Sequence, residues 1–182
     1  DLFAFGYAVD VAAPVAGDAT LAGFDVTLGQ GAGGNLRAGA NAAGRPPPGA
    51  APVMDFPDYK HFWNNKALDA VSAMSAVDGS PDETTLRLTG RFTARQVRAA
   101  LDPRPSDHVF EIGCGVGRIG RELLGDVARW TGLDISENML AVAAGRLGGG
   151  DRLSLAPLHG PRLEGLADGS MDKGYCVAVF IH

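Results

Sequence analysis

The chain has 182 residues, which is enough for one domain of ordinary size or for one domain with part of another. Its net charge of −5 argues against a surface that neutralises nucleic-acid phosphates, and its two cysteines exclude a disulfide scaffold. No apolar run reaches the ~18 residues that a membrane helix requires. We therefore expect a cytoplasmic protein that has neither a nucleic-acid partner nor a membrane partner.

The first part of the chain, residues 1–50, differs in composition from the rest. It contains 13 Ala and 10 Gly but no Lys and no Glu. Gly and Pro at this density favour a linker or the tail of another domain. Strands over 3–11 and 21–28 are the alternative that its short apolar stretches leave open.

Residues 51–105 are predicted to form a helical cap. Apolar residues at helical spacing predict a helix over 63–74, and Gly79-Ser80-Pro81 ends it. A second helix is expected over 93–101, where Pro103 stops it.

From residue 106 onward, strand and helix patterns alternate. We expect strands over 108–112, 127–133, 153–155 and 175–181. A helix over 118–124 and a helix capped by Ser136 and closed by Gly148 separate the first three strands. This alternation predicts a doubly wound α/β domain with a parallel sheet. The chain begins without Met and ends within the apolar run 177–182, so we expect a piece of a longer protein.

The most informative segment joins the first of these strands to its helix. Gly113, Gly115 and Gly117 alternate there, and Glu111 precedes them. Gly115, Gly117 and Gly120 also fit the dinucleotide pattern G-x-G-x-x-G. A carboxylate beside a pyrophosphate would repel it, whereas the cationic amino-acid end of a ligand has a use for one, directly or through water. Glu111 therefore favours a ligand of the second kind.

The segment 111–117 resembles the first motif of the class I S-adenosylmethionine-dependent methyltransferases. The segment 132–140 is similar to the second motif of that family, and 167–182 is similar to its fourth-strand motif. The resemblance covers about 58–182 and implies a Rossmann-like sheet of strand order 3-2-1-4, truncated after the fourth strand, with S-adenosylmethionine as cofactor. Asp134, at the end of the second strand, would accept the ribose hydroxyls. The cofactor-binding residues expected from the resemblance are Glu111, Gly113, Cys114, Gly115, Gly117, Asp134, Ile135 and Val177.

These features predict a methyltransferase that acts on an unidentified, small-molecule acceptor, with residues 106–182 as a partial cofactor-binding domain. The truncated sheet leaves its fourth strand on an open edge, so the chain alone is expected to be inactive. His182 is a weak candidate for a general base, against a structural or acceptor-positioning role.

Two other functions stay open. One is an NAD(P)-dependent oxidoreductase that uses Gly115, Gly117 and Gly120, and the other is a non-catalytic nucleotide-binding or docking module. Four scattered histidines and two cysteines show no metal-ligand spacing, so no metal is expected.

Overall fold

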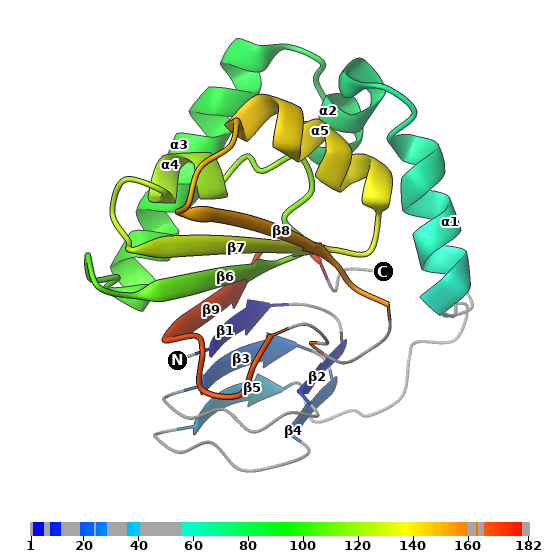
Figure 1. The fold of residues 1–182 in the computed structure, drawn as a ribbon. Coiled ribbons are helices and arrows are strands. Elements are labelled where there is room, and N and C mark those ends of the chain that lie inside the picture. The colour runs from blue at the N-terminus through cyan, green and yellow to red at the C-terminus, as the bar shows by residue number, and fades with distance from the viewer. Residues whose placement is uncertain are drawn as a thin grey trace.

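The computed structural model describes the backbone of strands at 2–5, 8–11, 19–23, 25–28 and 36–40, and then residues 56–159, 163 and 166–179. Its central element is a seven-stranded parallel sheet of order β5-β3-β1-β9-β6-β7-β8 (Figure 1). Four of these strands form the predicted domain: β6 (His108–Ile112), β7 (Arg129–Asp134), β8 (Leu153–Pro157) and β9 (Lys173–Cys176). Their order β8-β7-β6-β9 confirms the predicted order 3-2-1-4.

The N-terminal strands extend this sheet on the far side of β9. β1 (Leu2–Phe5), β3 (Ala19–Gly23) and β5 (Leu36–Ala40) join it, while β2 (Ala8–Val11) and β4 (Asp25–Leu28) pair in a separate two-stranded sheet. In the pairing of β1 with β9, Leu2 lies opposite Gly174 and Phe3 opposite Tyr175. The expectation of an open edge at the fourth strand was therefore wrong, because β1 takes that position.

The fourth strand is also shorter than predicted. The sequence suggested 175–181, whereas β9 ends at Cys176 and the chain bends over 177–179. Ala178 has a φ of +57°, which is incompatible with continued strand geometry. The last three residues, including His182, lie outside the described residues.

Three helices precede β6: α1 (Phe56–Lys66), α2 (Ala70–Asp78) and α3 (Glu83–Leu101). The single helix predicted over 63–74 was wrong, because Asp69 starts a new helix in its middle. The Asp69 carboxylate accepts a hydrogen bond from the Ser72 N–H at 2.7 Å, and the Ser72 hydroxyl accepts one from the Asp69 N–H at 3.1 Å. This reciprocal pair is a capping box. Asp82 likewise caps α3, which begins at Glu83 rather than at 93.

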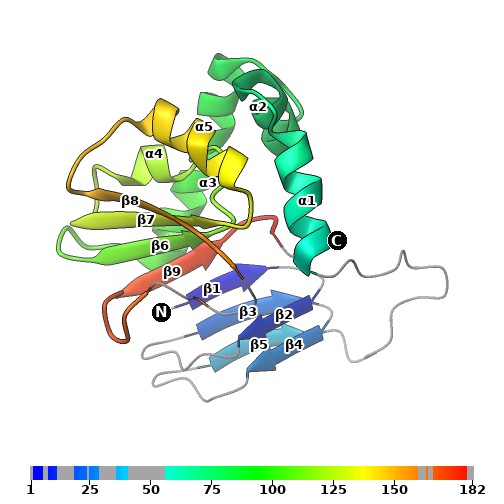
Figure 2. The ribbon, with the colours of Figure 1, turned by 45° about the vertical axis from the view of Figure 1, so that its right-hand side comes forward.

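α3, α4 (Gly120–Leu123) and α5 (Glu137–Leu147) pack on one face of β6, β7 and β9 (Figures 1 and 2). Ser136 caps α5 as predicted, accepting the Met139 N–H at 3.1 Å, and Gly148 is its C-cap. No helix in the described part of the chain is long and apolar enough to cross a membrane. The core on this face consists of Ala94, Val97, Leu101, Val109, Cys114, Ile119, Leu123, Val127, Trp130, Leu140 and Tyr175.

Candidate functional site

The glycine loop, residues 113–117, lies at the carboxyl end of β6, between this strand and α4. Gly113, Gly115 and Gly117 have φ values of +68°, +53° and +73°, a region that L side chains rarely adopt. The space beside each glycine is also taken by the protein. A Cβ on Gly113 would lie 2.3 Å from Val179 Cγ2, and one on Gly115 would lie 3.1 Å from Val77 Cγ2. Backbone geometry and close packing together therefore require these glycines.

Asp134, at the end of β7, reaches this loop directly. Its Oδ2 accepts the Gly115 N–H at 2.7 Å, and its Oδ1 accepts the Ser136 N–H at 2.9 Å. The side chain is buried, and burial raises the pKa of the carboxyl although the two N–H groups favour its ionised form. The structure thus brings the acid of the second motif onto the loop of the first, at the sheet edge where open α/β sheets bind ligands.

Glu111 lies beneath the loop, on the sheet face that packs against the helices. It is 2% exposed, and the Tyr175 hydroxyl donates a hydrogen bond to its Oε2 at 2.7 Å. Burial raises the pKa of Glu111 to about 8, while the Tyr175 hydrogen bond and the nearby Arg118 charge oppose this rise. The carboxyl is therefore a core group next to the loop and has almost no contact with solvent.

The other predicted binding residues surround the same strand ends. Cys114 is 3% exposed, and burial raises the pKa of its thiol well above the usual value, so it stays a neutral core residue and not a nucleophile. Ile135 is half-buried directly after Asp134, and Val177 packs on the core just beyond β9. His182 lies outside the described residues, so the structure gives it no position.

Sequence reasoning missed the contribution of α1. The Asn64 Oδ1 accepts hydrogen bonds from the Ser136 hydroxyl at 2.8 Å and from the Asn138 N–H at 3.3 Å. Lys60 forms an ion pair with Glu137 at 2.7 Å. These contacts hold α1 against the start of α5, immediately after Asp134. No motif marks Asn64 or Lys60, because each acts only through a partner more than seventy positions away.

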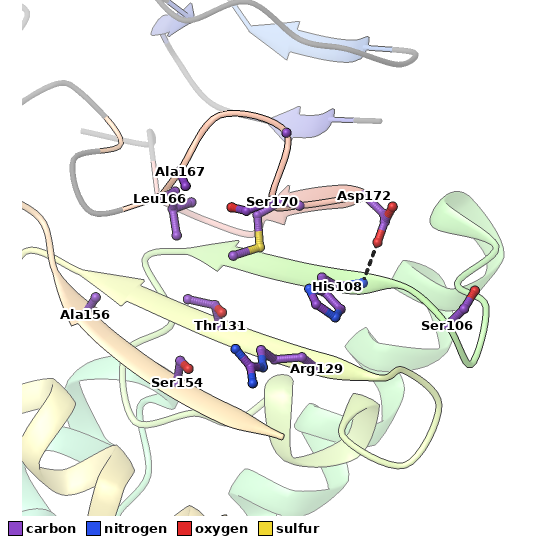
Figure 3. Close-up of a pocket in the computed structure, with 12 residues that line it drawn as sticks. Ser106, His108, Arg129, Thr131, Ser154, Ala156, Leu166, Ala167, Ser170 and Asp172 are labelled. Carbon is purple, nitrogen blue, oxygen red and sulfur yellow. Dashed lines mark hydrogen bonds between the residues drawn. The ribbon is translucent and has the colours of Figure 1, made fainter. Parts of the chain in front are cut away.

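A cavity of about 650 Å³ lies on the sheet face opposite to the one that α3, α4 and α5 cover (Figure 3). His108, Arg129 and Ser154 line it, and they alternate along their strands with the core residues Val109, Trp130 and Leu153. None of the predicted site residues that the structure describes lines this cavity. Within the described residues, no three His, Cys, Asp or Glu side chains are grouped so that they could hold a metal ion.

The comparisons with known proteins match this arrangement. Residues 109–182 match the family model described as a methyltransferase domain. The chain is 28% identical over 110 residues to O-methyltransferase cnsE of Penicillium expansum, covering 58% of this chain and 39% of that protein. It thus spans about two fifths of the length of this curated relative.

Two solved structures share the fold. Magnesium protoporphyrin IX methyltransferase (ChlM) from Synechocystis PCC 6803, with bound SAH, superposes with a TM-score of 0.52 at 26% identity, over 70% of this chain and 60% of that one. Phosphoethanolamine N-methyltransferase 1 of Haemonchus contortus gives 0.50 at 17% identity, over 70% and 26%, and shows the fold alone.

These matches favour the methyltransferase over the oxidoreductase that the second glycine pattern left open. Gly120, the last glycine of that pattern, is explained by packing: a Cβ there would lie 2.1 Å from Trp130 Cζ2. Residues 109–182 therefore resemble a methyltransferase domain, and their strand order is that of the Rossmann-like fold shared with ChlM.

Proposed function

We propose that the protein transfers a methyl group from S-adenosylmethionine to a small-molecule acceptor. The observation that carries this proposal is the hydrogen bond between Asp134 Oδ2 and the Gly115 N–H, at 2.7 Å. It joins the two sequence motifs expected to bind the cofactor at the carboxyl edge of the sheet. Residues 51–105 would act as a cap on this edge, and Val77 of α2 already lies against the loop.

Asp134 fits the adenosine end of the cofactor. Each oxygen of a carboxylate offers two lone pairs, and Asp134 uses one on each oxygen for a backbone N–H. The remaining lone pairs can accept hydrogen bonds from the two ribose hydroxyls. Ile135 follows Asp134, directly before Ser136, the N-cap of α5, and supplies an apolar surface for the adenine ring.

The glycine loop would receive the other end of the cofactor. Gly113, Cys114, Gly115 and Gly117 would present their backbone to it, and Val177 would border it at the end of β9. Glu111 is almost fully buried, so it would act on the cationic amino-acid end from beneath the loop or through a water molecule. The bound cofactor supplies an activated methyl group, and the protein contributes alignment of donor and acceptor.

The class of acceptor is suggested by the comparison with the curated relative. The curated relative is named an O-methyltransferase, so hydroxylated small molecules are the first acceptors to test. Cys114 and Cys176 are both buried and form no disulfide, which fits the reducing cytoplasm that we propose as the location.

Titration calorimetry with S-adenosylhomocysteine tests cofactor binding, and labelled methyl transfer to a panel of hydroxylated acceptors tests activity. Asp134→Asn should weaken binding, whereas Asp151→Asn, an exposed acid of the same type, should leave it unchanged. A change in NAD(P)H absorbance on addition of substrates, without cofactor methyl transfer, would instead identify an oxidoreductase.

A further inference from the structure

Three buried polar side chains on neighbouring strands are linked by hydrogen bonds along the helix-covered face of the sheet, beneath the glycine loop. The Trp130 Nε1–H donates to the Tyr175 hydroxyl at 3.0 Å, and this hydroxyl donates to Glu111 Oε2 at 2.7 Å. Trp130 and Tyr175 are fully buried, and Glu111 is 2% exposed. Glu111 and Tyr175 are direct neighbours in the register of β6 and β9, so the strands themselves hold the pair together.

The chemistry of the three groups determines which of them donates and which accepts in each hydrogen bond. An indole N–H can only donate, so Trp130 must use the acceptor side of the Tyr175 oxygen. The single hydroxyl proton of Tyr175 is then left for Glu111. Tyr175 does not lose this proton near neutral pH, because burial and the Glu111 charge raise its pKa well above the usual value.

The groups around Glu111 act in opposite directions on its charge. Burial, and then the nearby Asp134, favour the protonated carboxyl. The Tyr175 hydroxyl, the Arg118 charge and the Gly120 N–H favour the carboxylate. Cys114, a further titratable neighbour among the described residues, is a buried neutral thiol in this range. The resulting pKa of about 8 lets Glu111 change its charge near physiological pH when a charged ligand arrives.

We propose that Tyr175 is a positioning residue that holds Glu111 beneath the glycine loop, and that Glu111 releases a proton when the cationic amino-acid end of the cofactor binds there. This inference rests on the proposed function. In this step the O–H bond of the Glu111 carboxyl breaks and the proton goes to solvent. No bond of the cofactor forms or breaks, and the new carboxylate balances the ligand's ammonium group in a site with little solvent.

The experiment is titration calorimetry with S-adenosylhomocysteine, in buffers of different ionisation enthalpy, over a range of pH. At pH 7, a carboxyl with a pKa of about 8 is about nine-tenths protonated, so we expect release of about 0.9 proton per ligand bound. Affinity should rise up to about tenfold per pH unit below pH 8, and level off above it.

Two variants and one control test whether Glu111 is the group that releases the proton. Glu111→Gln should bind with neither proton release nor this pH dependence. Tyr175→Phe removes a donor that favours the carboxylate, so the midpoint of the pH profile should move to higher pH. Thr131→Val is the matched control, since it also removes a buried hydroxyl, but on a residue lining the cavity of the opposite sheet face. It should lower stability and leave the midpoint in place.

Carboxyl ¹³C NMR of the unaltered protein reads the same group without any substitution. The Glu111 signal should titrate near pH 8 alone and at lower pH with S-adenosylhomocysteine bound. Titration of Glu111 in the ordinary range near pH 4.3, or proton release that persists in Glu111→Gln, would overturn this inference and leave the proposed function standing. An unmoved midpoint in folded Tyr175→Phe would overturn the role of Tyr175. Absence of binding at every pH would overturn both proposals.

Discussion

The indole of Trp130 lies between two glycines, and this predicts a large effect of a very small substitution. A Cβ on Gly120 would lie 2.1 Å from Trp130 Cζ2 and 2.3 Å from Cε2, and one on Gly132 would lie 2.5 Å from Cη2. Trp130 is fully buried, so its ring cannot move out into solvent to make room. Gly120→Ala should therefore lower the free energy of unfolding by about 3 kcal/mol, the upper end of the usual cost of overpacking. For a chain of this length, that corresponds to a fall in Tm of roughly 6–12 °C.

A double-mutant cycle identifies the indole as the cause. Trp130→Phe removes the outer ring atoms that the new methyl group would meet. Gly120→Ala should therefore cost about 1–2 kcal/mol less in the Trp130→Phe background, as urea unfolding would show. Gly125→Ala is the matched control, since a Cβ there meets nothing within 4 Å. Equal effects of the two glycine substitutions, or additivity in the cycle, would refute the packing argument.

Three further predictions concern the site and its supports. Asp134→Asn keeps one acceptor oxygen but turns an NH₂ group toward a backbone N–H. We expect it to weaken cofactor binding, measured by calorimetry, by about 1.5–3 kcal/mol. An unchanged affinity would remove Asp134 from the site. Asn64→Ala should remove about 1–2 kcal/mol of local stability and speed amide hydrogen exchange in α1, whereas Asn65→Ala, which is exposed, should change neither. The raised pKa of Glu111 means that the folded state binds more protons than the unfolded state between about pH 4.5 and 8, so this group's contribution to stability should fall as pH rises through that range. Glu111→Gln should flatten this part of a pH-dependent denaturation series, and a slope that survives in the variant would contradict the assignment.

The parts of the fold predicted correctly from sequence are those determined by local patterns. β6 has the predicted bounds, because Val109, Phe110 and Ile112 form a short apolar stretch that Gly113 ends. α5 begins and ends at its predicted caps, Ser136 and Gly148, because capping depends on residues within one turn. The hydrogen bond between Gly115 and Asp134 was not itself predicted, although both residues follow strands that were expected to be parallel and therefore to end at the same edge of the sheet.

The errors arose where contacts between distant segments decide the structure. The pairing of β1 with β9 joins Leu2 to Gly174, and no local pattern reports a partner at that separation. The break between α1 and α2 is the exception, because there a local signal was missed: Asp69 caps α2 in the middle of an amphipathic pattern that continues across it. Val77 and Asn64 reach the site only through the packing of helices, so neither could be identified as a site residue from the sequence.

Core packing and the candidate site share residues, and this affects how substitutions in the motif should be interpreted. Trp130 fills the space beside Gly120 and also donates to Tyr175, which in turn donates to Glu111. A substitution at Gly120 therefore disturbs the core and the environment of Glu111 together, although Gly120 need not touch a ligand. Loss of binding in such a variant is evidence for a ligand contact only when its stability is unchanged. The same condition applies to Asp134→Asn, because this substitution keeps the size of the side chain but turns an NH₂ group toward the N–H of Gly115 or Ser136. Its loss of binding therefore has to be compared with its measured stability.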